Sequence, residues 1–105
     1  MGALTYSADL LAAVKAYLQI TWTDAATDLR IGGLILQGEQ YLDRRAGAAQ
    51  DYESVSSART LLFEYVRYAR DNALDVFENN YLHLIISLAE EAAVNGMEDS
   101  AQAGL

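Results

Sequence analysis

The chain has 105 residues, 52% of them hydrophobic and 21% charged, and its net charge is −8. This length fits one domain, and the acidic balance argues against a general binder of nucleic acid or anionic membranes, since both need clustered Lys and Arg. The lack of cysteine excludes disulfides, thiolate catalysis and cysteine-based metal sites. There is also no proline, which favours long uninterrupted helices.

No targeting or membrane segment is expected. The N-terminus lacks a basic region followed by a sustained apolar run, so no signal peptide is predicted. The longest apolar runs, near Ile31–Leu36 and Leu84–Ala89, are too short to span a bilayer.

The first predicted helix covers about residues 8–18, where Leu10, Val14 and Leu18 recur at the i, i+4, i+8 spacing of an amphipathic helix. Ser7 is its expected N-cap. The stretch 20–24 then predicts a turn that presents Thr23 as the cap of the next helix.

The second predicted helix runs from Asp24 to about Arg45 and ends at Gly47, a residue that readily adopts the left-handed conformation. Gly32 and Gly33 lie inside it and together cost about 2 kcal/mol relative to alanine. They indicate either a break or the close approach of another backbone, and we favour a continuous, closely packed helix. Its expected apolar positions are Ala25, Leu29, Ile35, Leu36 and Leu42.

Residues 46–56 form the longest predicted link, after which Ser54 or Ser56 caps a third helix that continues to about Asn72. A fourth helix is predicted from about Ala73 to Val94, ending at Asn95 and Gly96. It carries one apolar stripe of Leu74, Phe77, Tyr81, Leu84, Ile85 and Leu88, and a second of Leu82, Ile86, Ala89 and Ala93.

A helix that is apolar on two sides has more than one neighbour to bury against. In so small a protein, part of that surface is expected at a subunit interface. The predicted fold is therefore an all-α bundle of four, at most five, helices over residues 1–96, followed by a flexible C-terminal tail over 97–105.

The sequence shows little catalytic chemistry. The only histidine, His83, has no nucleophile placed beside it by any motif, and we expect it on a helix surface or at an interface. Acids pair at helical spacing, but each pair has basic neighbours and is expected to form a solvated face. The pairs are Asp24 with Asp28, Glu39 with Asp43, and Asp71 with Asp75. We therefore predict no enzyme, no metal and no cofactor.

One segment resembles a known family. It contains the run Tyr65-Val66-Arg67-Tyr68-Ala69-Arg70 and then Ala73-Leu74, Phe77-Glu78 and Asn80-Tyr81. This pattern is similar to the small head–tail connector (adaptor) proteins of long-tailed bacteriophages and prophages. The N-terminal half of the chain also resembles that family. The resemblance there rests on the stretch from Leu11 to Ile20, on Trp22-Thr23-Asp24, and on a helix that ends at Tyr41-Leu42. The likeness covers about residues 8–90.

The resemblance implies a structural virion protein at the head–tail junction, made in the bacterial host cytoplasm. It implies a ring of about twelve copies below the portal protein, which extends the DNA channel and supports a stopper or tail-completion protein. The free chain is expected to be monomeric or to associate only weakly, with the ring forming on the portal. DNA would pass through the lumen without sequence-specific binding. It further implies that residues 88–105 dock into the portal, with Leu88, Val94, Met97 and Leu105 as the candidate docking residues.

A closed ring requires two different complementary patches on each copy. The alternating charges along residues 64–78 are candidates for one of them, and the chain's seven tyrosines are also candidate interface residues. We expect Arg67 or Arg70 to pair with an acid of the neighbouring copy; pairing of Arg67 with Asp71 inside the helix is the alternative. The tyrosines can be interpreted equally well as residues at the edge of the core or as residues of a subunit interface. The candidate interface residues are Tyr65, Arg67, Tyr68, Arg70, Asp71, Asp75, Phe77, Glu78 and Tyr81.

Two other functions remain open at the level of sequence. A small helical adaptor or regulator of the bacterial cytosol would bind a partner helix in a groove. A DNA-binding packaging protein would need a basic recognition helix, and we expect no helix of this chain to be net basic over its length.

Overall fold

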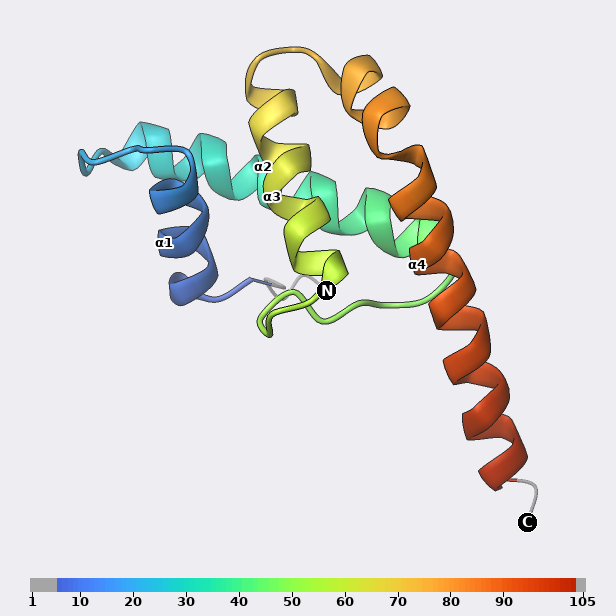
Figure 1. The fold of residues 1–105 in the computed structure, drawn as a ribbon. Helices are drawn as coiled ribbons and strands as arrows, with labels where there is room; N and C mark the ends of the chain where they lie inside the picture. Colours follow the sequence, from blue (N-terminus) through green and yellow to red (C-terminus); the bar gives the residue numbers. More distant parts are fainter. Residues whose placement is uncertain (1–5, 104–105) are drawn as a thin grey trace.

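Four α-helices make up the part of the chain that the structure describes (Figure 1). The computed structural model describes the backbone of residues 6–103 and the side chains of residues 6–94. The helices are α1 (Ala8–Tyr17), α2 (Ala25–Ala46), α3 (Ser57–Arg70) and α4 (Leu74–Ala103). No strand occurs within residues 6–103, so the predicted all-α class is confirmed.

Helices α2 and α3 form the centre of the molecule, because each of them contacts all the other helices. Helix α1 lies against one side of this pair and α4 against the other, and α1 and α4 do not pack on each other (Figure 1). The C-terminal part of α4 extends beyond the body of the other helices.

The helix ends follow local capping rules. The Ser7 hydroxyl accepts a hydrogen bond of 2.9 Å from the backbone N–H of Leu10, and Ser56 caps α3 in the same way. Gly47 ends α2 with a left-handed φ of 79°. These three predictions are confirmed, with Ser56 used in place of Ser54.

The predicted cap of α2 is wrong by one residue. Asp24, not Thr23, is the N-cap, and its carboxylate accepts from both the backbone N–H and the hydroxyl of Thr27, at 3.0 and 2.8 Å. A carboxylate that accepts two hydrogen bonds at the positive end of the helix dipole is the stronger cap.

Helix α2 is continuous through its glycines, as we favoured. A Cβ atom at Gly32 would collide with the hydroxyl of Tyr6, whereas one at Gly33 would meet open space. The sequence analysis did not single out Gly38, which allows the closest approach of α3. A Cβ atom there would lie 2.7 Å from Cδ1 of Leu62 and 2.8 Å from Cδ1 of Tyr65.

The core consists of apolar side chains from all four helices. On α2, Ile31, Ile35 and Leu42 are buried, while Leu29, predicted as apolar core, is 79% exposed. The face of α2 that packs on α3 contains Ile31, Ile35, Gly38 and Leu42, which follow the helical repeat. Leu29 does not fall on this face. The largest fully buried side chains are Phe77, Leu10, Ile31, Ile35, Leu42, Leu61, Leu62, Ile85, Val14 and Val66.

The predicted end of the last helix is also wrong. The backbone of α4 continues past Asn95 and Gly96 to Ala103. One glycine costs a helix only about 1 kcal/mol, and no proline follows to stop it. The flexible tail predicted over 97–105 falls outside the residues whose side chains the structure describes, and it stays a prediction.

The packing of α2 on α3 can be tested with a glycine pair. We expect Gly38→Ala to lower the free energy of unfolding by about 1–2 kcal/mol, because overpacking against Leu62 and Tyr65 outweighs the gain in helix propensity. Gly33→Ala is the matched control and should raise the free energy of unfolding by about 0.5–1 kcal/mol. Urea denaturation measures both values, and equal stability of the two variants would contradict the close packing at Gly38.

Candidate functional site

The described side chains form no evident centre for catalysis. Within residues 6–94 there is no group of three or more His, Asp or Glu residues that could hold a metal ion. His83 is exposed on α4. Two of the acid pairs have structural partners: Asp28 forms an ion pair with Lys15 at 2.6 Å, and Asp43 accepts a hydrogen bond from the Tyr52 hydroxyl at 2.6 Å.

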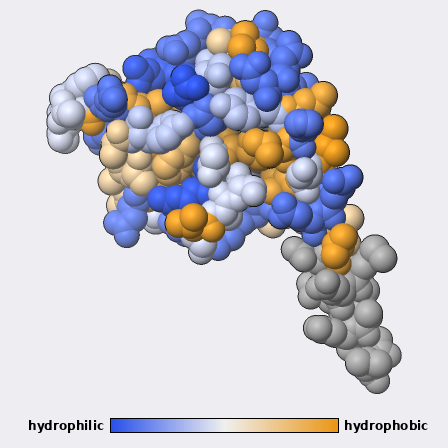
Figure 2. Space-filling model, in the orientation of Figure 1, coloured by the Kyte–Doolittle hydropathy of each residue, from blue (hydrophilic) through white to orange (hydrophobic). Residues whose placement is uncertain are grey.

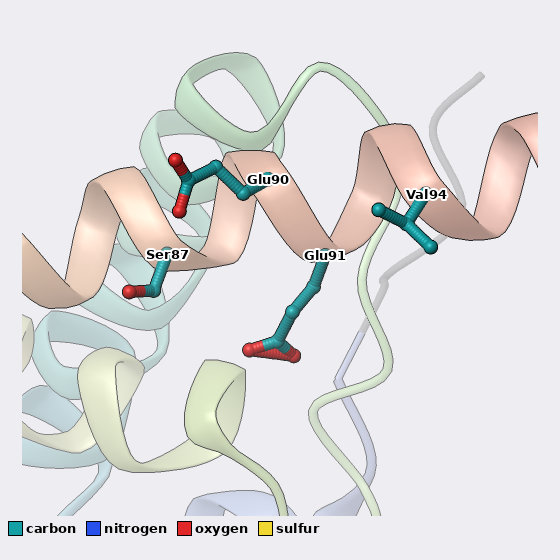
Figure 3. Close-up of a pocket in the computed structure, with 4 residues that line it drawn as sticks. All are labelled: Ser87, Glu90, Glu91 and Val94. Atoms are coloured by element: carbon teal, nitrogen blue, oxygen red, sulfur yellow. The ribbon is translucent and has the colours of Figure 1, made fainter.

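One surface hollow is lined by Ser87, Glu90, Glu91 and Val94, all from α4 (Figure 3). Figure 3 shows Glu90 and Glu91 pointing away from each other. The two carboxylates therefore do not converge on one ligand, as an acid–base pair or a cation site would require.

The most connected polar group of the structure is the carboxylate of Glu64 on α3, a residue that is only 5% exposed. It accepts hydrogen bonds from the hydroxyl of Tyr17 on α1 and from the hydroxyl of Tyr81 on α4, the latter at 2.7 Å. It also accepts from Nη2 and Nε of Arg67 at 2.7 and 3.2 Å. Glu64 thus connects α1 to α4, two helices that do not contact each other directly.

These bonds change the acidity of the groups that take part. Burial is the largest single influence on Glu64 and acts to raise its pKa, but hydrogen bonds from Arg67, Tyr17 and Tyr81 together outweigh it, so the pKa lies below its ordinary value. The hydrogen bond to Glu64 raises the pKa of Tyr81 to about 12 and also raises the pKa of Tyr17. At neutral pH, Glu64 is therefore the ionised acceptor and both tyrosines are donors.

Aromatic residues surround Phe77 and close the space between α2, α3 and α4. The rings of Tyr65 and Tyr81 lie 5.6 and 5.3 Å from the Phe77 ring, and those of Tyr68 and Tyr41 lie 6.0 and 6.3 Å from it. Edge-on and tilted arrangements at these distances are favourable. Four of the seven tyrosines thus edge the core, which was one of the two interpretations that the sequence left open.

The surface side of α4 is apolar over several turns. Leu82 is 43% exposed and Ile86 is 49% exposed; Ala89 and Ala93 follow on the same face, where Ala93 is exposed. We call Leu82, Ile86, Ala89 and Ala93 the outer stripe of α4. Figure 2 shows hydrophobic atoms reaching the surface along the side where α4 runs. The second apolar stripe predicted from the sequence is therefore present and uncovered.

The first predicted stripe faces the core, except at one position; Leu74 and Tyr81 at its N-terminal end are partly buried. Phe77, Ile85 and Leu88 are buried, but Leu84 is 47% exposed. Leu84 lies about 100° around the helix from Ile85 and so falls off the face that packs on α2 and α3.

Helix α3 has a face of arginines. Arg59, Phe63, Arg67 and Arg70 recur at i, i+4, i+8 and i+11 and so share one side of the helix. With three arginines and a single acid, Glu64, α3 is net basic over its length, so our expectation that no helix is net basic was wrong. The end of α3 at Arg70 leaves Asp71 outside the helix.

The structure divides the predicted interface residues into two groups. Tyr65 and Phe77 are 4% and 1% exposed, so they belong to the core of the single chain and are not surface residues. Arg67 pairs with Glu64, not with Asp71. Tyr68 and Tyr81 are half-buried beside Phe77. The residues of the set that lie at least partly at the surface are Arg67, Tyr68, Arg70, Asp71, Asp75, Glu78 and Tyr81.

The predicted portal-docking residues do not form one surface. Leu88 is buried at 4% exposure because its side chain faces the bundle, which makes it a core residue. Val94 is 53% exposed. Met97 and Leu105 lie outside the residues whose side chains are described.

Charge is distributed very unevenly along the chain. All seven Lys and Arg residues lie before residue 71, and seven of the fifteen acids lie after residue 70. Nearly the whole net charge of −8 therefore belongs to α4 and its flanks. The total charge of the chain conceals this asymmetry, which a count of the charges in each half of the sequence shows.

Comparison of the chain with protein-family models, with curated proteins and with solved structures finds no match. None of the helices in the described part of the chain combines the length and the apolar character needed to cross a membrane.

The role of Glu64 can be tested by removing its charge. We expect Glu64→Gln to lower the free energy of unfolding at pH 7 by about 1–3 kcal/mol, because Arg67 loses its partner and one tyrosine hydroxyl loses a strong acceptor. Exposed Glu90 makes no ion pair among the described residues, so Glu90→Gln is the matched control and should leave stability unchanged.

The pH dependence of this difference has a defined sign. Since the pKa of Glu64 is lower in the folded protein than its ordinary value of 4.5, its stabilising effect is complete above pH 4.5 and is lost as the pH falls through the folded pKa. The gap between wild type and Glu64→Gln should therefore narrow below pH 4.5. Urea denaturation between pH 7 and pH 3 measures this, and a gap that stayed constant would contradict the lowered pKa.

Proposed function

We propose that this chain is a structural assembly subunit, a protomer of a phage head–tail connector ring that docks below the portal and extends the DNA channel. The observation that carries the proposal is the outer stripe of α4. Leu82 and Ile86 remain about half exposed on a helix whose Phe77, Ile85 and Leu88 side chains are buried in the core. Water-exposed apolar side chains in a row mark a contact surface.

The shape and charge of the molecule support a ring in particular. A closed ring requires two different surfaces on each copy, one for each neighbour. The acidic α4 with its outer stripe and the arginine face of α3 are two such surfaces, and they differ in charge. The segment that resembles connector proteins, residues 57–81, forms α3 and the first turns of α4 and so contributes to both.

The proposed passage of DNA fits the charge of the chain. A net charge of −8 repels a phosphate backbone and keeps DNA from adhering to the wall of a channel. The same outer stripe would also suit the groove of another partner, as in a small helical adaptor. The two functions differ in what covers the outer stripe. In a connector ring other copies of the chain cover it, alone or on the portal, whereas in an adaptor a different protein does.

The proposal predicts self-association that depends on the outer stripe. We expect the wild-type chain to form larger species at tens of micromolar, or when portal protein from the same genome is added. The double variant Leu82→Ser/Ile86→Ser should weaken this association by about tenfold or more, because it removes apolar contact area. Leu29→Ser is the control, since Leu29 is even more exposed but lies on α2.

Analytical ultracentrifugation measures the association, and electron microscopy of the mixture with portal shows whether a ring forms. A wild-type chain that stays monomeric in both experiments contradicts the connector function, and equal weakening by Leu29→Ser contradicts the role of the outer stripe.

A further inference from the structure

Two hollows lie along the arginine face of α3 and meet at Tyr17 of α1. The first is lined by Tyr17, Val55, Ser56, Arg59, Thr60 and Phe63. The second is lined by Tyr17, Leu18, Gln19, Arg67, Arg70 and Asp71. Both hollows are lined by residues of α3 and by Tyr17 at the end of α1, and we call the two of them together the arginine groove.

The first hollow is lined mainly by apolar surface, part of which is exposed, whereas the second, beside Arg70, is lined mainly by polar groups. Val55 is 97% exposed and Tyr17 is 46% exposed. The ring of Phe63 packs edge-on against the Tyr17 ring, with the ring centres 5.3 Å apart. These side chains leave an apolar surface that the described residues of the same chain do not fully cover.

Two of the three arginines are fixed in place by the protein itself. Arg59 donates to the carbonyl oxygens of Tyr52 and Glu53 at 3.0 and 3.2 Å, and its guanidinium lies 4.9 Å from the centre of the Phe63 ring. Arg67 is held by Glu64. Their positions are therefore established before any partner arrives, which lowers the entropic cost of binding.

Arg70 differs from these two because it still has hydrogen-bonding capacity to offer. Its Nη1 atom is buried and has no hydrogen-bond partner. Asp71 stands at the mouth of the same hollow, yet no ion pair joins it to Arg70 among the described residues. A buried guanidinium nitrogen without an acceptor is costly, and a carboxylate is the group that best matches guanidinium geometry.

The complement of this groove is present on the same chain, on its opposite side. The outer stripe of α4 is apolar, and Asp75, Glu90 and Glu91 on that helix are exposed and make no ion pair within residues 6–94. From Leu82 to Ala93 the stripe is about 16 Å long, and the arginine face from Arg59 to Arg70 spans the same number of residues and so the same length.

The stripe cannot reach the groove of its own molecule. The groove lies on the α1 side of α3, whereas α4 packs on the other side, and α1 and α4 do not contact each other (Figure 1). Contact between the two surfaces therefore requires two copies of the chain. When two copies make this contact, one still has a free stripe and the other a free groove. Further copies can therefore add in the same way, and such head-to-tail contacts can close into a ring.

We infer that the outer stripe of α4 of one copy docks into the arginine groove of the next copy, with a carboxylate of that α4 accepting hydrogen bonds from Arg70. This inference rests on the proposed ring and names the two surfaces that form its repeating contact. A second copy is favoured over nucleic acid because the first hollow exposes apolar side chains, which phosphates would not use, and because α4 carries exposed apolar side chains together with exposed acids.

The experiment uses two full-length variants that each damage one surface. The groove variant is Val55→Asp/Arg70→Glu, which places negative charge on an exposed link residue and on the unpartnered arginine. The stripe variant is Leu82→Ser/Ile86→Ser. We expect each variant alone to self-associate about tenfold or more weakly than wild type. An equal mixture should form a one-to-one complex of defined size, because the intact stripe of one variant meets the intact groove of the other.

Sedimentation of the single variants and the mixture distinguishes the outcomes, and circular dichroism confirms that each variant is folded. Mixed variants that remain monomeric, although the wild type associates, overturn the inference. A single variant that self-associates as strongly as wild type also overturns it and indicates that its intact surface pairs with a like surface. A groove variant that assembles on portal as well as wild type overturns the contact and leaves the connector function standing.

Two further results bear on the inference. A wild-type chain that never associates, with or without portal, removes both the connector function and this contact. Binding of duplex DNA at physiological salt that the groove variant loses would assign the groove to nucleic acid and overturn the inference.

Discussion

The structure depends on one buried carboxylate. Glu64 on α3 accepts hydrogen bonds from Tyr17 on α1, from Tyr81 on α4 and from Arg67 on its own helix. Because α1 and α4 have no contact of their own, this group fixes the two outer helices relative to the central pair. A charged group that is nearly inaccessible to water requires this full set of donors, since any missing donor would leave a buried charge poorly compensated.

This arrangement also positions both candidate assembly surfaces. Tyr17, held by Glu64, forms the meeting point of the two hollows of the arginine groove. Tyr81, held by the same carboxylate, fixes the rotation of α4, so that Phe77 and Ile85 face the core while Leu82 and Ile86 face water. The internal network therefore decides which sides of the helices are left for partners, and it separates an acidic, apolar surface from a basic one on opposite sides of the molecule.

The family resemblance and the structure bear on different parts of the candidate site. The resemblance drew attention to residues 65–81, and several of them have internal roles: Tyr65 and Phe77 are buried, and Arg67 belongs to the Glu64 network. Arg70 differs because its Nη1 atom is buried and has no hydrogen-bond partner among the described residues. The groove residues Tyr17, Val55 and Phe63 were missed, because they come from three segments that are brought together only by the packing of α1 on α3.

The sequence by itself determined the helices, since caps such as Ser7 and Ser56, the left-handed Gly47 and the absence of proline act within a few residues of the chain. It also contained the charge asymmetry and the two apolar stripes of α4. Only the tertiary structure decided which stripe is buried, that Gly38 is a packing site and that Arg70 lacks a partner. These outcomes depend on which of several apolar helix faces packs against the neighbouring helices. Contacts between residues far apart in the sequence, such as Tyr17 and Glu64, decide this, and no local sequence pattern encodes those contacts.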